Sequence, residues 1–342
     1  MDPFISHHLR GVSRTYALLV PMLPAGLSDA VGLAYLLMRI IDTYEDAPEL
    51  AHEARAAGLS RLESVLSQLA PDAADPREAA NAAAPPLADS AATPRVGDLV
   101  AEPAIGETAA ERALMVEAPR VLAQLAALDA PYRDAIAACG LTMIRGVREF
   151  FERSAARELP YPAIRGPEEL RRYCYFVAGV VGEMLCRMMA HFLRLPTLLR
   201  LRELAVELGI GLQLVNILKD ALKDSYQGRR YLPATDGAAV GGAASYRDIY
   251  QAALSEARTS LQKGVEFVLA LPAAARGLRA FCGLPIAWGA MTLARAERDA
   301  GKAKISRGAV QASIALFARL GGDDRALREW FDGLLRPAPQ PA

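Results

Sequence analysis

Apolar side chains recur at helical spacing along most of this chain, whereas the apolar/polar alternation typical of strands is scarce. The helical segments are rich in Ala, Leu and Arg, and turn residues separate them. A chain of this kind has no strands from which to build a parallel sheet, so the pattern predicts an all-α fold. We expect helices at about 5–20, 27–47, 49–69, 109–127, 130–156, 168–192, 199–224, 245–270, 274–299 and 306–319.

The composition favours a globular protein. Hydrophobic residues make up 52% of the 342, which is enough for a sizeable core and too much for a disordered chain. The 39 basic residues equal the 39 acidic ones, which argues against a nucleic-acid-binding protein. No uncharged apolar run reaches the roughly 18 residues of a transmembrane helix. We therefore expect a cytoplasmic protein without a transmembrane segment, with a peripheral membrane contact left open.

One segment differs from the rest in composition. Residues 71–96 contain 10 Ala and 5 Pro, and almost no large apolar side chain that could offset the entropy of ordering them. We expect a flexible insert at about 71–108, with a functional lid as the alternative, inside one domain of residues 1–335. The Pro-rich residues 336–342 are expected to be a disordered tail.

The first acidic cluster ends an apolar helical segment. Glu45 and Asp46 follow Asp42 by three and four residues, so on a helix Asp42 neighbours both other carboxylates. Arg39 and Tyr35 extend the same stripe backwards. The segment therefore predicts a helix that presents several carboxylates on one face.

The second cluster has the same form. Gln213, Asn216, Asp220 and Asp224 are spaced three, four and four residues apart, and large apolar residues lie between them. A polar stripe in so apolar a segment is difficult to explain as ordinary solvated surface. The segment predicts a second polar helix face.

Neighbouring carboxylates repel one another, and a bound cation offsets the repulsion. Clustered oxygen ligands suit Mg²⁺, which shares its coordination shell with substrate phosphates. Two such faces therefore favour a magnesium and diphosphate site over the alternative of two solvated helix ends. Guanidinium groups near the clusters pair well with phosphate oxygens. The candidates, each also explicable as a surface residue, are Arg14, Arg39, Arg229 and Arg230.

Together these motifs resemble the squalene and phytoene synthases, a family of head-to-head isoprenoid-condensing enzymes. The resemblance covers most of the chain outside the insert and the tail, with Lys219 standing where an arginine is common. No membrane anchor is evident, and we expect the greatest similarity to bacterial squalene synthases. The matching blocks are Ser13-Arg14, residues 36–39, 42–46, 173–182, 213–224 and 228–233, together with 281–285 and 304–308.

The resemblance implies a helical bundle around a central cavity, in which Mg²⁺ on the acidic faces holds two diphosphates at one end. The implied catalytic residues are Tyr173, Asp42, Asp46, Asp220 and Asp224. The implied metal ligands are Asp42, Glu45, Asp46, Asp220, Asp224 and Asn216. The implied diphosphate-binding residues are Ser13, Arg14, Arg39, Gln213, Lys219, Arg229 and Arg230.

The squalene-forming branch also implies NADPH, with Asn216, Lys304 and Arg307 as contacts. Small and aromatic side chains are expected to line the cavity, with close helix packing or ordinary core as the alternative. These residues are Ala178, Gly179, Gly182, Phe176 and Phe281.

The implied reaction condenses two farnesyl diphosphates to presqualene diphosphate and reduces it to squalene, in an enzyme that we expect to be a monomer. The nearest alternatives are phytoene, dehydrosqualene and presqualene diphosphate synthases, which share the metal site. A non-catalytic helical scaffold is a more distant alternative, since such a protein would be expected to lose the carboxylates.

Overall fold

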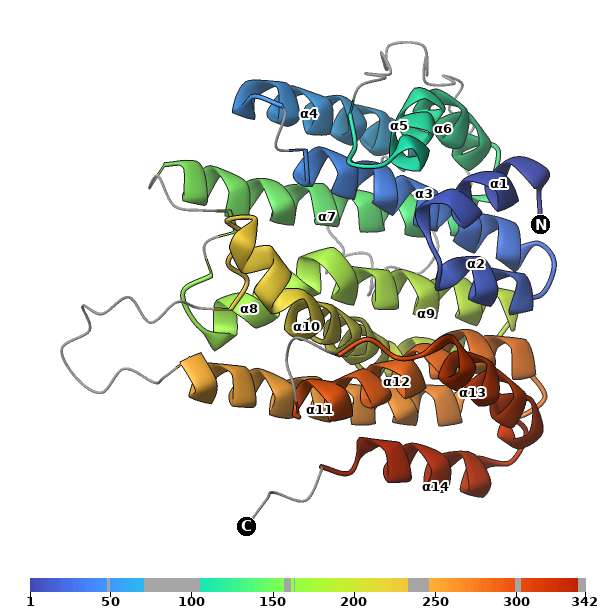
Figure 1. Cartoon of the computed structure of the whole chain (residues 1–342). Coiled ribbons are helices and arrows are strands. Elements are labelled where there is room, and N and C mark those ends of the chain that lie inside the picture. Colours follow the sequence, from blue (N-terminus) through green and yellow to red (C-terminus); the bar gives the residue numbers. More distant parts are fainter. Residues whose placement is uncertain are drawn as a thin grey trace. The chain divides into compact units, whose positions relative to one another are not determined.

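The described part of the chain is built from helices. The computed structural model describes residues 1–47, 50–70, 105–156, 161–162, 164–232, 246–298 and 303–337. Within these ranges there is no strand, which confirms the all-α prediction (Figure 1). Residues 71–104 of the expected flexible insert and residues 338–342 of the expected tail lie outside the described residues.

Two compact units divide the chain. The first contains the described residues up to Arg145 and the segment Arg187–Arg194, and the second contains Gly146–Cys186 and the described residues from Leu195 onward. Helices α7 (Ala130–Ala155) and α9 (Val180–Phe192) each contribute residues to both units. The single domain expected over residues 1–335 stays a prediction.

Helix α3 (Leu27–Glu45) is the centre of the first unit. Most of its side chains are buried on every face, which is typical of a helix surrounded by others. Figure 1 shows its neighbours gathered around it. These are α1 (Pro3–Val12), α4 (His52–Leu69), α5 (Ala109–Val116) and α6 (Ala118–Ala126), while α2 (Tyr16–Leu19) and the short 3-10 turn η1 (Val20–Met22) link α1 to α3.

Two expected helices of this unit are each interrupted. The first stops at Ser13, whose backbone is extended and whose Oγ accepts a hydrogen bond from the Tyr16 N–H at 2.9 Å. The helix expected at 109–127 breaks at Glu117, because Pro119 lies in the first turn of the next helix and has no N–H to donate. Residues 105–108 are ordered rather than flexible, since Ile105 is only 1% exposed and Thr108 caps α5.

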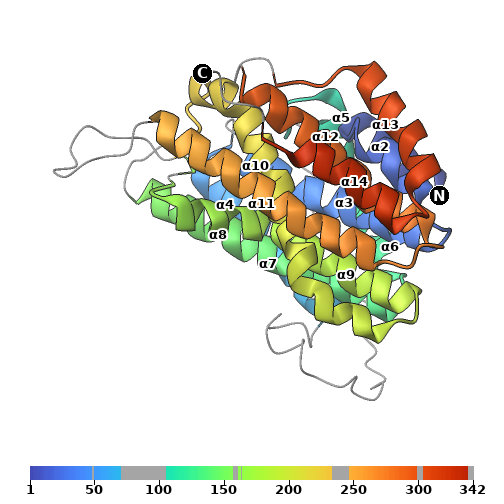
Figure 2. The same ribbon diagram turned by 90° about the horizontal axis from the view of Figure 1, so that it is seen from below.

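The second unit is organised around α10 (Arg202–Tyr226) and α11 (Tyr246–Ala270), which lie side by side in both views (Figures 1 and 2). Helix α12 (Arg276–Ala296) packs on both of them. Helices α13 (Arg307–Leu320) and α14 (Asp324–Leu335) cover α12. The remaining elements are α8 (Pro167–Cys174), the π-helical turn η3 (Tyr175–Gly179) and the 3-10 turn η4 (Pro196–Leu201).

Helix α14 was not among the expected helices. Its signals are present in the sequence: the Asp323 carboxylate accepts a hydrogen bond from the Ala326 N–H at 3.0 Å. Leu327, Phe331 and Leu335 are buried at a spacing of four residues. The cap and the spacing together predict a short amphipathic helix.

Helices α8 and α9 join through η3 into one continuous helix from Pro167 to Phe192. By length and composition alone it could cross a membrane, but 61% of its most apolar window is buried inside the protein. Such burial is typical of a core helix.

Candidate functional site

The first unit carries an acidic helix end. Helix α3 ends at Glu45, and the Asp46 N–H donates to the Asp42 carbonyl at 2.8 Å, so Asp42 and Asp46 lie one turn apart as expected. Glu45 is buried, while 35% of the Asp42 side chain remains exposed. Desolvation by the surrounding protein, followed by repulsion from Glu45, raises the pKa of Asp42 well above its usual value. This carboxylate therefore lies where a cation would stabilise its charged form.

Arg39 connects this acidic end to a residue that the sequence analysis missed. Its Nη1 lies 4.0 Å from Asp42 Oδ2, and its Nη2 forms an ion pair with Glu111 Oε1. Glu111 is buried and belongs to a capping box with Thr108 at the start of α5. The spacing Thr108-x-x-Glu111 indicates the capping box, but the sequence holds no signal for the contact with Arg39, 72 residues away.

Ser13 and Tyr35 lie near Arg39. Ser13 is buried, and its hydroxyl shares a hydrogen bond with Tyr35. Burial raises the pKa of Tyr35, although that bond and the positive charge of Arg39 oppose the rise. Arg14 is exposed. Ser13, Tyr35 and Arg39 thus form one polar group in the first unit.

The second polar face is a helical stripe on α10, as predicted. Gln213, Asp220 and Asp224 are partly exposed and Asn216 is exposed. The residues between them, including Leu214 and Ile217, are buried. Lys219 Nζ donates to Asn216 Oδ1 at 3.2 Å and lies 3.2 Å from Asp220 Oδ2. The ammonium group therefore already offsets part of the charge of this face.

A tight turn follows α10. Gly228 has a φ of 76°, a conformation that favours glycine, and the Arg229 N–H donates to the Asp224 carbonyl at 2.9 Å. The turn fixes the backbone of Arg229 beside the end of the acidic stripe. The side chain of Arg230 is exposed. Pro233, the end of the matching block, lies outside the described residues.

Tyr173 is held by two aromatic rings. It is 3% exposed, with the Phe150 ring edge-on at 5.4 Å and the Tyr231 ring tilted at 5.4 Å between centroids. The Phe150 ring also contacts a cation, because the Arg153 guanidinium lies 4.6 Å from the centroid of that ring. The phenol of Tyr173 therefore occupies a defined position at the end of α8.

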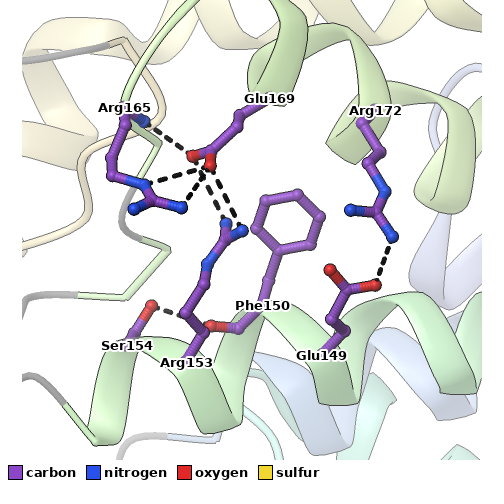
Figure 3. Close-up of polar contacts among 7 residues, drawn as sticks. All are labelled: Glu149, Phe150, Arg153, Ser154, Arg165, Glu169 and Arg172. Carbon is purple, nitrogen blue, oxygen red and sulfur yellow. Dashed lines mark hydrogen bonds and ion pairs between the residues drawn. The ribbon is translucent and has the colours of Figure 1, made fainter.

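Ion pairs hold the two helices that bring Phe150 to Tyr173. Figure 3 shows Arg153 of α7 and Arg165 both directed at the Glu169 carboxylate, at 3.2 and 2.7 Å. On the other side of Phe150, Arg172 of α8 binds Glu149 of α7 at 2.6 Å. These contacts tie the end of α7 to α8.

Gly182, one of the small residues expected to line a cavity, lies at a close helix contact, whereas the cavity role of Ala178 and Gly179 stays a prediction. A Cβ added to Gly182 would stand 1.9 Å from the Ala205 carbonyl oxygen, and one added to Gly209 would stand 2.1 Å from that of Ala178. A Cβ added to Gly179 would meet only side chains, at 3.0 Å from Tyr175 and at 3.2 and 3.3 Å from Ile210 and Val206 of α10. Gly182 therefore allows two helices to pack closely, and the space left by its missing side chain is filled by α10 rather than by a substrate chain. Phe176 packs over Gly146.

This packing predicts a large cost for Gly182→Ala. The added methyl group would collide with backbone of α10, which cannot rotate away as a side chain can, and we expect a loss of about 1–3 kcal/mol or more. Gly333→Ala is the matched control, because no atom lies within 4 Å of its added Cβ and alanine favours the helix. Urea unfolding of both variants measures the difference, and equal stabilities would contradict this packing role.

The residues expected to contact NADPH are on the surface of the second unit. Lys304 and Arg307 are exposed, and the Lys304 carbonyl accepts a hydrogen bond from Arg295 Nη1 at 2.6 Å. Arg307 is the first residue of α13, which Ser306 caps. Phe281 is 3% exposed in α12.

A buried carboxylate that the sequence analysis did not single out joins α8, α10 and α11. Glu207 accepts hydrogen bonds from Arg171 at 2.6 Å, Lys263 at 2.8 Å and Ser260 at 2.8 Å. Desolvation alone would raise the pKa of Glu207, but these donors outweigh it and the pKa is lowered.

The lowered pKa of Glu207 predicts acid sensitivity. A carboxyl group whose pKa is lower in the folded state stabilises the fold above its unfolded-state pKa, and this contribution is lost as the pH falls through the folded-state value. Wild-type protein should therefore lose more unfolding free energy than Glu207→Gln between about pH 7 and pH 3. Urea unfolding across that range checks this, and parallel pH profiles would contradict it.

Magnesium fits the donors on these two faces. Among the described residues, no group of three or more His, Cys, Asp or Glu side chains is arranged to hold a metal ion by itself. Each face nevertheless offers carboxylate oxygens, and Mg²⁺ commonly takes one or two carboxylates and fills its shell with water and phosphate oxygens. The donors therefore suit an ion that binds together with a diphosphate.

Known proteins are similar to this chain in sequence. A squalene synthase from Mycosarcoma maydis is 28% identical over 222 residues, covering 65% of this chain and 33% of that protein. The human squalene synthase is 25% identical over 227 residues, covering 66% of this chain and 45% of that protein. The chain thus matches less than half the length of these relatives. Both relatives are eukaryotic, so the matches do not support the expectation that the chain is most similar to bacterial squalene synthases.

Solved structures share the fold. A ligand complex of TcSQS superposes with a TM-score of 0.73 at 21% identity, covering 99% of this chain and 93% of that one. A squalene synthase from Alicyclobacillus acidocaldarius gives a TM-score of 0.52 at 19% identity, covering 87% and 93%. The squalene/phytoene synthase family matches residues 9–313, and the chain therefore belongs to this family.

Proposed function

We propose that this protein condenses two farnesyl diphosphates head to head, with Mg²⁺, to presqualene diphosphate and reduces that product to squalene with NADPH. The observation that carries the proposal is the family match over residues 9–313, which includes both polar helix faces with their carboxylates intact. A scaffold without catalysis would be expected to lose these carboxylates, whereas this chain keeps Asp42, Asp46 and Asp220.

In the first unit, Asp42 and Asp46 would hold Mg²⁺ at the end of α3. The bound ion would neutralise the diphosphate and so assist its departure. Arg39 offers guanidinium donors to the same diphosphate, and the buried hydroxyl of Ser13 lies in the same polar group through Tyr35.

In the second unit, Asp220 and Asp224 would bind Mg²⁺ in the same way. Lys219 supplies a positive charge beside Asp220 but cannot form the bidentate pair that an arginine would make with a phosphate. Arg229 and Arg230 follow the acidic stripe directly and would add two guanidinium groups.

Tyr173 would steer the allylic cation or pass its proton to a diphosphate oxygen. The rings of Phe150 and Tyr231 support this role because they hold the phenol in place while excluding water from it. For the reduction, the exposed cations Lys304 and Arg307 are suited to the phosphate groups of NADPH, with Asn216 as a further contact.

Incubation with farnesyl diphosphate and Mg²⁺, with and without NADPH, tests the proposal. Squalene formed only with NADPH is the expected result. Presqualene diphosphate under both conditions would assign the enzyme that stops early. Dehydrosqualene, or phytoene from geranylgeranyl diphosphate, would assign the other family branches, and no product from any substrate would refute the enzymatic assignment.

A further inference from the structure

Arg39 is held at one side of its guanidinium group. Nη2 is paired with Glu111, Nη1 lies 4.0 Å from Asp42 Oδ2, and the buried Nε has no hydrogen-bond partner among the described residues. We propose that Glu111 is a positioning residue, which orients Arg39 for a diphosphate and keeps it from closing onto Asp42. This inference rests on the proposed function of the acidic end of α3.

Glu111 is itself fixed in place. Its side chain is only 9% exposed, and its Oε2 accepts a hydrogen bond from the Thr108 N–H at 2.9 Å. The Glu111 N–H in turn donates to Thr108 Oγ1 at 3.2 Å, which completes the capping box. One carboxylate oxygen is thus bound by the helix start and the other by Arg39. A carboxylate held in this way removes rotamer freedom from a long arginine side chain before any ligand binds.

The distance between Arg39 and Asp42 shows what this restraint prevents. The two residues are three apart on α3, so their side chains can form a close ion pair on the helix surface. Their separation of 4.0 Å is the outer limit of such a pair, whereas the contact of Arg39 with Glu111 is close. Without Glu111, Arg39 would be free to pair closely with Asp42. That pairing would neutralise the carboxylate and occupy the donors that a diphosphate needs.

Binding of inorganic diphosphate in the presence of Mg²⁺, measured by isothermal titration calorimetry on the full chain, tests the inference. Glu111→Gln keeps the shape of the side chain and can still accept from the Thr108 N–H, but it removes the charge opposite Arg39. Charge-assisted hydrogen bonds contribute enough that we expect the diphosphate Kd to rise about tenfold or more. Thr108→Ala is the matched control, because it removes the hydroxyl that accepts from the Glu111 N–H yet keeps the backbone N–H that holds Glu111 Oε2. Its Kd should stay within about twofold of wild type.

A double-mutant cycle shows whether Glu111 acts through Arg39. In an Arg39→Gln background, Glu111→Gln should have no further effect on the Kd, because the group that it positions is absent. Additive effects, an unchanged Kd in Glu111→Gln, or equal losses in Glu111→Gln and Thr108→Ala would each overturn the proposal. If Glu111→Gln fails to fold, Glu111→Asp keeps the charge and withdraws the carboxylate, and a Kd equal to that of wild type would likewise overturn it.

The outcome is separable from that of the proposed function. Wild-type protein that binds Mg²⁺ and diphosphate but converts no prenyl diphosphate would refute the function and leave the calorimetric comparison intact. Wild-type protein that forms squalene, with Glu111→Gln binding diphosphate equally well, would refute the positioning role alone.

Discussion

Asp42→Ala should abolish product formation from farnesyl diphosphate while leaving the helical circular dichroism signal unchanged. The carboxylate is expected to act through Mg²⁺ on the departing diphosphate, and removing one preorganised group of this kind typically lowers the rate about a hundredfold to a thousandfold. The thermal midpoint should stay the same or rise, because desolvation and repulsion by Glu45 disfavour the charged form of the partly exposed Asp42 in the absence of a ligand.

Asp29→Ala is the matched control for Asp42→Ala, since it removes an aspartate from the same helix outside the acidic cluster. Asp29 accepts a hydrogen bond from the Asp2 N–H at 2.8 Å, so its loss should slightly weaken the fold and leave turnover intact. Asp220→Ala on α10 should abolish turnover as Asp42→Ala does. More than about a tenth of wild-type activity in either variant would remove that residue from the metal site.

Arg279→Met should strongly destabilise the second unit. Arg279 is 1% exposed in α12, and its guanidinium donates to the carbonyls of Leu269, Leu271 and Gly321 at 3.1, 2.9 and 3.3 Å. It also binds the Asp324 carboxylate at 2.6 Å. Methionine fills similar space but donates nothing. The three carbonyls therefore lose a donor, at about 1–3 kcal/mol for each one left buried and unsatisfied, and we expect a total loss of about 3–5 kcal/mol.

The Arg279 prediction is measured by urea unfolding at neutral pH. Arg325→Met is the control: its side chain is 89% exposed and pairs with Glu329 one turn away on α14, an interaction expected to contribute well under about 1 kcal/mol. If Arg279→Met lowers the free energy of unfolding no more than Arg325→Met does, the second unit does not depend on the hydrogen bonds of the Arg279 guanidinium to these carbonyls.

Local patterns in the sequence predicted much of the fold and both polar helix faces. The polar residues from Gln213 to Asp224 lie along one helix, as their spacing of three and four residues predicts. The interruption at Ser13 was harder to predict than the one at Pro119, since the serine lies within an otherwise periodic segment and its hydrogen bond to the Tyr16 N–H is visible only in the structure. Helix α14 carried its own cap and apolar spacing, and counting these would have found it.

Contacts between distant segments could not be predicted in the same way. Glu111 reads as a helix cap and Glu207 as an ordinary surface acid, because their partners are far away in the chain. The glycines of the motif at 173–182 show the same limit. Sequence leaves open whether a missing side chain makes room for a ligand or for another helix, and for Gly182 the Ala205 carbonyl decides in favour of the helix.

The π-helical turn at Tyr175–Gly179 has a consequence for how a deletion would affect this chain. Such a turn accommodates one surplus residue within a helix that is regular on both sides. If one of these five residues were deleted, the segment could adopt ordinary α-helical geometry. Tyr173 would then keep its aromatic neighbours, and Gly182 would keep its contact with α10. A one-residue deletion here should thus be tolerated by the fold, whereas the same deletion in a regular stretch of α9 would rotate the rest of that helix by about 100°.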